Sequence, residues 1–281
     1  MTAYASNEPP AGQAAVRKAF GIRQLRAARA KGGRLTMLTC YDASFATVSC
    51  EAGVDMLLVG DSLGMVIQGH TSTLPVSLDD ICYHTACVAR AAPSSMIIAD
   101  MPFASYQASA EQAFQNAALL MQAGAQMVKL EGGAWLAPTV SFLTQRGIPV
   151  CAHLGLTPQS VHTLGGYMVQ GRGAAGEALV ADARLLEKAG ADIVLVELIP
   201  SPLAAQLTAA LTVPTIGIGA GPHVTGQVLV VYDILNLTPG RKARFVKNYL
   251  SQTSDIQAAI ALFVSEVNSG AYPGPEHGFE S

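Results

Sequence analysis

The sequence predicts an α/β protein in which eight parallel strands and the helices between them close into a single (β/α)8 TIM barrel, with added N-terminal and C-terminal helices. Three observations favour this fold. Eight short apolar runs recur along the 281 residues, segments of helical period lie between them, and the dipeptide Ala-Gly precedes a strand that ends in an acid at three separate places. Barrels of this kind often run to about 200–250 residues as one domain, so the length fits. A doubly wound open sheet is the alternative.

The eight candidate strands are almost continuously apolar, which is typical of parallel strands that are covered on both faces. They span residues 35–42, 55–61, 95–100, 126–131, 149–155, 192–197, 214–221 and 227–233. Each run ends in an acid or a glycine. Because the carboxyl ends of barrel strands face the active site, these terminal residues are the first candidates for function.

Helical periodicity is clearest in residues 109–124, where apolar residues from Ala113 to Met121 recur on one face. A further helix is expected near residues 14–30, and another near 254–270. The predicted caps are Ser109 with Gln112, Ser201, and Ser254 with Gln257, while Gly53, Gly124, Gly190 and Gly270 are expected to end helices in the left-handed conformation.

Composition narrows the class of protein. Apolar residues make up 50% of the chain and charged residues 13%, which excludes a disordered chain and indicates extensive burial in a core or between subunits. The net charge of −3 gives no basic footprint for nucleic acid or an anionic membrane. Five cysteines without a CxxC pair argue against a disulfide framework or a zinc knuckle, and reduced thiols fit a cytoplasmic location.

The chain shows no internal boundary between domains. No apolar run approaches the roughly 18 residues of a membrane helix, and the N-terminus lacks the pattern of a signal peptide. We expect residues 1–13 to form a mobile tail and residues 14–281 to form one catalytic barrel domain.

Six acids stand at the ends of candidate strands: Asp42, Asp61, Asp100, Glu131, Glu197 and Asp233. A single acid at such a position is as readily a helix cap as a functional group. Six of them on one rim would repel one another unless a cation joined them or some held protons.

Three of these acids, Asp61, Asp100 and Glu131, come from consecutive early strands and are candidates for one metal site. Carboxylate oxygens without histidine or cysteine suit a hard divalent ion such as Mg²⁺, which leaves positions open for substrate oxygens. The spacing alone is a weak pattern, because many barrels end their strands in acids.

Lys129 lies two residues before Glu131, so both side chains point to the same face of one strand. A lysine inside a barrel is costly unless it is paired, which favours a functional role: pairing an anionic substrate, or, less favoured, forming a Schiff base. Glu197 is the candidate general base, with helix capping as the alternative. His153 could orient a substrate, although a lone histidine in a strand is more often a core residue.

Two glycine motifs are weaker indications of a binding site. Gly171, Gly173 and Gly176 form a literal GxGxxG, but no convincing strand precedes them, and dinucleotide binding requires a strand, a turn and a helix in that order. The segment GIGAG at 217–221 ends a strand where some barrels bind phosphate. We prefer a tight turn there.

Several longer stretches are more selective than any single motif. They are TCYDASFA, LLVGDSLGMVIQGHTSTLPVSLDDICYHT, ADMPFASY, VKLEGG, AHLGLTPQSV, GGYMVQGRG, GIGAG and YPGPEHGF. Through them, roughly residues 20–280 closely resemble the ketopantoate hydroxymethyltransferase (3-methyl-2-oxobutanoate hydroxymethyltransferase) family of pantothenate and coenzyme A biosynthesis. The resemblance implies a (β/α)8 barrel. Thr225 and Tyr232 stand where close relatives are expected to carry Asp and His.

The resemblance implies a reaction and a set of site residues. The family transfers a hydroxymethyl group from 5,10-methylenetetrahydrofolate to 3-methyl-2-oxobutanoate, through an enolate that Mg²⁺ stabilises. Its metal ligands match Asp61, Asp100 and Glu131, its ketoacid-binding positions match Asp61, Ser62, Asp100 and Lys129, and its catalytic base matches Glu197. A cytoplasmic homo-oligomer, a decamer as in relatives, is implied as well, with no nucleic-acid or membrane partner.

Two other functions stay open. A Mg²⁺-dependent lyase or mutase of the phosphoenolpyruvate mutase and isocitrate lyase group would also stabilise an enolate in a barrel, but such enzymes commonly carry a KxCG-type loop, which is absent here. A ketoacid-binding sensor without catalysis would have no need of a base such as Glu197.

Overall fold

The eight-stranded barrel is confirmed by the computed structural model, which describes residues 18–92, 94–240 and 242–280. Every strand pairs in parallel with the next, and β8 pairs with β1 to close the sheet. The strands are β1 (Leu35–Thr39), β2 (Met56–Val59), β3 (Met96–Asp100), β4 (Met127–Glu131), β5 (Val150–Gly155), β6 (Ile193–Glu197), β7 (Thr215–Ile218) and β8 (Gly226–Leu229). Several are shorter than the apolar runs that predicted them, because the ends of those runs form the loops and helix starts that follow each strand.

Helices surround the barrel and cover one of its ends. The α-helices are α1 (Ile22–Ala30), α2 (Ala43–Glu51), α3 (Leu63–Val66), α4 (Leu78–Ala89), α5 (Ala110–Gln122), α6 (Ala137–Thr144), α7 (Val161–Leu164), α8 (Ala174–Lys188), α9 (Ser201–Ala210), α10 (Val231–Ile234) and α11 (Ile256–Ser269). The short 3-10 helices are η1 (Ala134–Leu136), η2 (Pro158–Ser160), η3 (Leu250–Gln252) and η4 (Pro275–His277). In none of the described ranges does a helix have both the length and the apolarity to cross a membrane.

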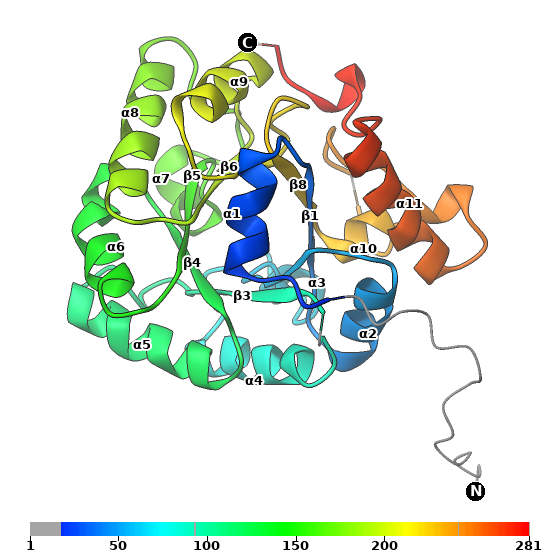
Figure 1. Ribbon diagram of the computed structural model, residues 1–281, viewed down its shortest axis with the longest axis horizontal. Helices are drawn as coiled ribbons and strands as arrows, with labels where there is room; N and C mark the ends of the chain where they lie inside the picture. Colours follow the sequence, from blue (N-terminus) through cyan, green and yellow to red (C-terminus); the bar gives the residue numbers. More distant parts are fainter. Residues whose placement is uncertain (1–17, 93, 241, 281) are drawn as a thin grey trace, which may run out of the picture.

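The predicted N-terminal helix is α1, which lies in front of the strands and inside the ring of the other helices (Figure 1). Its Leu25 is fully buried against the side chains inside the barrel, so α1 covers the amino-terminal end of the strands. The predicted mobile tail, residues 1–13, and the predicted domain boundary at residue 14 lie outside the described residues.

Two predicted helix starts differ from the structure. Ser109 caps α5 by accepting a hydrogen bond from the Gln112 N–H. The Gln112 side chain, however, accepts a hydrogen bond from the N–H of Ala108 and not from that of Ser109, so the predicted capping box is incomplete. The prediction that Ser201 caps the next helix is wrong, because Ser201 is already helical and follows Pro200. Its N–H instead donates to the carbonyl of Phe279, which brings the C-terminal segment against the start of α9.

The last helix also begins one residue later than predicted. Asp255, not Ser254, caps α11, and its carboxylate accepts a hydrogen bond from the Ala258 N–H. The Ser254 hydroxyl donates to the same carboxylate, so the charged group takes the capping position. Gly270 ends the helix in the left-handed conformation, as predicted, and the glycines of the three repeated joints, Gly53, Gly124 and Gly190, also have positive φ.

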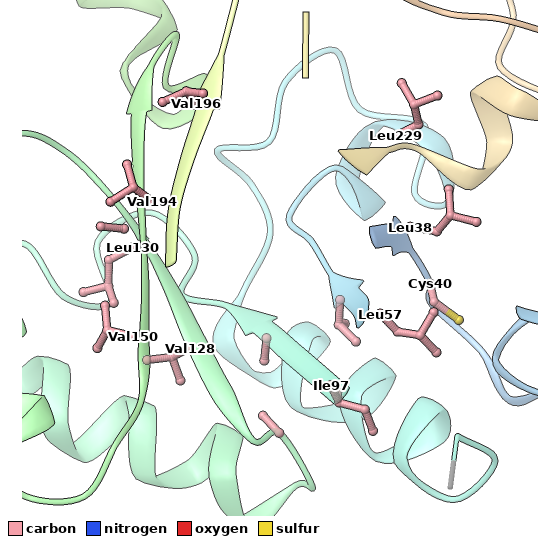
Figure 2. Packing of buried hydrophobic residues seen from close by; sticks show 14 of the residues in the cluster. Leu38, Cys40, Leu57, Ile97, Val128, Leu130, Val150, Val194, Val196 and Leu229 are labelled. Carbon is pink, nitrogen blue, oxygen red and sulfur yellow. The ribbon is translucent and has the colours of Figure 1, made fainter. Parts of the chain in front are cut away.

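The strands separate two hydrophobic clusters, which explains their nearly continuous apolarity. Outward side chains such as Leu57, Ile97 and Val128 pack against the helices, and Figure 2 shows this outer cluster. Alternate residues, such as Ile98 and Met127, form the inner cluster together with Leu25. On β4, the inward residues after Met127 are polar, so the apolar barrel interior has a polar layer at the carboxyl end of its strands.

The register of the strands aligns this polar layer. Asp100 pairs with Lys129 across β3 and β4, and Glu131 pairs with His153 across β4 and β5. Gly155 pairs with Glu197 across β5 and β6; its φ is +91°, and a Cβ there would lie 2.3 Å from the Glu197 carbonyl oxygen. The tight approach therefore requires glycine next to Glu197.

Candidate active site

A cavity of about 160 Å³ lies at the carboxyl ends of the strands. Apolar residues of the inner cluster, Leu58, Leu195 and Val228, form part of its wall. The predicted site residues that line it are Asp61, Ser62, Asp100, Lys129, Glu131, His153 and Glu197. The structure thus brings together residues that are far apart in the sequence.

Two of the six strand-end acids do not line this cavity, so the expectation that all six converge is wrong for Asp42 and Asp233. Asp42 lies three residues beyond β1 and caps α2, where its carboxylate accepts a hydrogen bond from the Phe45 N–H at 2.9 Å. Asp233 lies within α10. Asp42 thus precedes the first turn of a helix and Asp233 lies inside one, and neither lines the cavity.

Asp61, Asp100 and Glu131 are close enough to share one ion, since one carboxylate oxygen from each lies within 4.8 Å of the others. All three are buried, and their exposed fractions are 4%, 1% and 3%. Burial and then the charges of Asp100 and Glu131 raise the pKa of Asp61 well above its ordinary value. The cluster thus holds more negative charge than its surroundings readily stabilise, and this oxygen-only donor set fits a hard divalent cation.

Lys129 compensates part of that charge. Its Nζ lies 2.9 and 2.8 Å from the two carboxylate oxygens of Asp100 and 2.8 Å from Glu131 Oε1. Burial alone would lower the pKa of Lys129, but the charges of Asp100 and Glu131 outweigh burial and raise it well above its ordinary value. The amine is therefore a fixed ammonium group, which disfavours the Schiff-base interpretation because an imine forms from the neutral amine.

His153 connects the carboxylate cluster to Glu197. Its Nδ1 lies 3.1 Å from Glu131 Oε1, and its Nε2 lies 3.3 Å from Glu197 Oε2 without the alignment of a hydrogen bond. Burial and the charge of Lys129 lower the pKa of His153, but its contacts with Glu131 and Glu197 raise it to about 9 overall. The histidine is therefore part of the site and not an isolated core residue.

The pKa of Glu131 is lowered, whereas that of His153 is raised. Burial alone would raise it, but the charges and hydrogen bonds of Lys129 and His153 lower it to about 2. Glu131 Oε2 also accepts a hydrogen bond from the Gln159 N–H at 3.0 Å. Glu131 is therefore ionised at neutral pH, with both oxygens held in place.

Gln159 and Tyr106 complete the site but were not found from the sequence. The Gln159 side chain donates to Asp61 Oδ2 at 3.0 Å, and it accepts from the Tyr106 hydroxyl at 2.8 Å. Gln159 lies in η2, directly after β5, within the stretch AHLGLTPQSV. Its position in a loop at the carboxyl end of a strand was the available signal, but an amide side chain has no charge to mark it as functional.

Thr73 was also missed. Its side chain is 2% exposed and lines the cavity, yet its Oγ1 has no hydrogen-bond partner within the described part of the chain. By contrast, the hydroxyl of Ser62, which also lines the cavity, shares a hydrogen bond of 2.8 Å with the buried Tyr41 hydroxyl. A buried hydroxyl without a partner is unfavourable, so Thr73 is available to bind a ligand in the cavity.

No glycine of either motif lines this cavity, although Ile218, within the segment 217–221, does. A loop follows α7 and leads to Gly171, so the strand that dinucleotide binding requires is not there. Gly219 and Gly221 have φ values of 61° and 78°, and a Cβ on Gly221 would lie 2.2 Å from Ser201 Oγ. The segment 217–221 is thus the closely packed turn that we preferred.

Comparison with solved structures shows that the barrel fold is shared with other proteins of low sequence identity. Phosphonopyruvate hydrolase, solved in complex with oxalate and Mg²⁺, superposes with a TM-score of 0.59 at 14% identity, covering 88% of this chain and 96% of that chain. A 2,3-dimethylmalate lyase of the phosphoenolpyruvate mutase and isocitrate lyase superfamily superposes with a TM-score of 0.57 at 19% identity, covering 74% and 80%.

Sequence comparison is more specific. A sequence profile described as ketopantoate hydroxymethyltransferase matches residues 19–275. The 3-methyl-2-oxobutanoate hydroxymethyltransferase of Burkholderia vietnamiensis is 56% identical over 268 residues, which is 95% of this chain and 98% of that protein. The enzyme of the same name from Neisseria gonorrhoeae is 56% identical over 258 residues, which is 92% of this chain and 98% of that protein. This chain therefore belongs to the ketopantoate hydroxymethyltransferase family.

Proposed function

We propose that this protein is a 3-methyl-2-oxobutanoate hydroxymethyltransferase, which transfers a hydroxymethyl group from 5,10-methylenetetrahydrofolate to 3-methyl-2-oxobutanoate and forms ketopantoate for pantothenate biosynthesis. Identity of 56% over 95% of the chain supports this activity. The observation that carries it is a single buried cavity containing three carboxylates, a fixed ammonium group and one further acid, Glu197.

We assign Asp61, Asp100 and Glu131 as the residues that hold Mg²⁺. Their buried oxygen-only donor set and the raised pKa of Asp61 support a divalent cation at this position. When bound, the ion would supply Lewis-acid polarisation of the keto oxygen.

The ketoacid is bound and oriented by the side chains around the metal ligands. Lys129 presents a charge that Asp100 and Glu131 hold in place, so it can stabilise negative charge that develops on the substrate oxygens during enolisation. Ser62, held by Tyr41, supplies a hydroxyl to the same end of the substrate. Asp61 and Asp100 contribute to ketoacid binding as metal ligands.

Glu197 acts as the general base. It removes the proton from C3 of the ketoacid, and the electron pair of that C–H bond forms the new bond to the methylene carbon of the folate donor. Formation of this carbon–carbon bond breaks one of the two carbon–nitrogen bonds of the methylene bridge. Cleavage of the second carbon–nitrogen bond and addition of water, whose oxygen becomes the new hydroxyl, then release ketopantoate. The two folate nitrogens take up the proton from Glu197 and one proton from water, which gives tetrahydrofolate. His153 lies 3.3 Å from Glu197 and positions its carboxylate, and no covalent bond between enzyme and substrate is required.

The activity is tested by following ketoacid and folate together. We expect 3-methyl-2-oxobutanoate and 5,10-methylenetetrahydrofolate to disappear in equal amounts with Mg²⁺ present, and ketopantoate to appear. A lyase or mutase would instead act on its substrate without folate, and a sensor would bind the ketoacid without turnover. Either of those results would contradict the proposal.

Thr73 provides a specific test of the binding site. Thr73→Val keeps the shape of the side chain but removes the unpartnered hydroxyl, so we expect the KM for the ketoacid to rise about tenfold, as the loss of about 1.4 kcal/mol from one hydrogen bond to a charged group would produce. Steady-state kinetics with varied ketoacid measure the effect. Thr85→Val is the matched control, because Thr85 is also buried with an unpartnered hydroxyl but lies in α4. An unchanged KM in Thr73→Val would exclude Thr73 from the binding site.

We infer that copies of the chain form a cytoplasmic homo-oligomer, specifically a decamer. The support is the apolar content of 50%, together with large apolar side chains that are more than half exposed on the outer helices. Tyr83 on α4 and Trp135 on η1 are 67% and 55% exposed. Side chains of this kind are enriched where protein surfaces associate.

A further inference from the structure

The inner cavity is too small for the folate donor. Pockets that bury most of a drug-sized ligand have volumes of about 300–1,000 Å³, whereas the cavity around the carboxylates has about 160 Å³. A ketoacid fits a space of this size, but a pterin ring joined to an aminobenzoyl group does not. The body of the donor must therefore lie outside, and only its methylene carbon can approach the ketoacid.

A second cavity, which we call the outer cavity, has a volume of about 420 Å³. The residues of its wall that matter here are Thr71, Ser72, His162, Gly165, Gly166 and Tyr167. Tyr167 lines both cavities, and Thr73, two residues after Thr71, lines the inner one. The two cavities therefore adjoin along Tyr167 and along the segment 71–73.

We propose that the outer cavity binds the pterin and aminobenzoyl part of the folate donor and directs its methylene carbon past Tyr167 toward Glu197. This assignment rests on the proposed function.

The wall of the outer cavity suits a flat aromatic ligand. Tyr167 is 50% exposed, and its hydroxyl contacts the Sδ of Met65, which is 40% exposed and also lines the inner cavity. The neighbouring Met168 is 55% exposed. An aromatic ring and thioethers at the entrance of a polar site offer the stacking and sulfur contacts that a planar heteroaromatic ring favours.

The backbone next to Tyr167 is open. Gly165 and Gly166 have φ values of 76° and 124°, and a Cβ on Gly166 would meet no atom within 4 Å. A ring can therefore approach this peptide closely, without a side chain between them. His162 and Thr71, both exposed, add polar groups at the edge of the cavity for the amide and amine groups of the ligand.

A competing cavity of about 510 Å³ lies between the start of α8 and α9. Its wall includes Arg172, Leu203 and Gln206, but it shares no residue with the inner cavity. A donor bound there would have no common wall along which to reach the ketoacid. Continuity through Tyr167 thus favours the outer cavity.

Two pairs of variants test the assignment. Tyr167→Ala removes the ring and Tyr167→Phe keeps it, so we expect the dissociation constant of tetrahydrofolate, measured by calorimetry, to rise at least tenfold in the first and less than threefold in the second.

Thr71→Trp fills the outer cavity, and Gln206→Trp fills the competing cavity. We expect only Thr71→Trp to weaken tetrahydrofolate binding and to raise the KM for the folate donor, again at least tenfold, while the KM for the ketoacid is unchanged.

A partial reaction separates this proposal from the proposed function. Exchange of the C3 proton of 3-methyl-2-oxobutanoate with deuterated water requires the inner cavity but no folate, so Thr71→Trp should exchange at the normal rate. Normal tetrahydrofolate affinity in both Thr71→Trp and Tyr167→Ala, or weakened affinity in Gln206→Trp alone, would overturn the outer-cavity assignment. Absence of exchange in the unmodified protein would instead contradict the proposed function itself.

Discussion

The Glu197→Gln variant is expected to lose about 10²–10⁴-fold in kcat, the usual contribution of a general base. The amide keeps the size of the side chain but cannot accept the C3 proton. The KM for the ketoacid should change little, because Lys129, Ser62 and the metal ligands remain. Proton magnetic resonance in deuterated water measures the same step without folate, and exchange at C3 should fall by the same factor as kcat.

Glu111→Gln is the control for this substitution, since Glu111 is an exposed acid in the first turn of α5, outside the cavity. It should leave both turnover and exchange unchanged. If C3 exchange in Glu197→Gln proceeded at the normal rate while turnover fell, Glu197 would act after proton removal, and another group would be the base.

The second large effect is expected in Asp61→Asn, which should weaken Mg²⁺ binding strongly. Loss of a group that merely supports a metal ligand already lowers affinity by about 10–100-fold, so loss of a ligand should cost at least about 100-fold. At a Mg²⁺ concentration 100 times the normal dissociation constant, the stabilisation on binding should then fall from about 2.7 to about 0.4 kcal/mol. Calorimetric titration and thermal unfolding with and without Mg²⁺ measure the two quantities.

Metal-free Asp61→Asn should be at least as stable as the metal-free unmodified protein, because an amide does not experience the repulsion that raises the pKa of Asp61.

The affinity for Mg²⁺ should also depend on pH. A proton on Asp61 competes with the metal, so Mg²⁺ affinity should rise with pH in the unmodified protein, and this dependence should be weaker in the variant. Asp42→Asn is the control: its carboxylate caps α2 outside the cavity, so Mg²⁺ binding should be unaffected. Unchanged Mg²⁺ affinity in Asp61→Asn would remove Asp61 from the metal site.

The strands could be predicted because each one carries its own signal. A run such as residues 192–197 is buried on both faces, so nearly every position is apolar, and the Ala-Gly joint before it marks the end of a helix. Helix starts were less certain, because Ser254 and Asp255 both have capping side chains and local sequence does not decide between them.

The charged site residues were also predictable, for a similar reason. Lys129 and Glu131 are conspicuous within an otherwise apolar run, and a charge in such a place is unfavourable unless it has a partner. The position of an acid at a strand end does not by itself explain why Asp61 belongs to the site and Asp42 does not, although the family resemblance selected Asp61. Both are acids that follow a strand closely, and only the path of the chain after the strand sends one into a helix cap and the other into the cavity.

Local sequence by itself determined the barrel and the acids at its rim, since apolar runs and isolated charges are properties of a few neighbouring residues. Only the tertiary structure decided which further side chains complete the site and how they contact the acids. Gln159 contacts Asp61 across 98 positions of sequence. His153 pairs in register with Glu131 on β4, and its ring reaches Glu197, which lies on β6 two residues beyond the register partner of His153. Such contacts depend on closure of the whole barrel, which no short segment encodes.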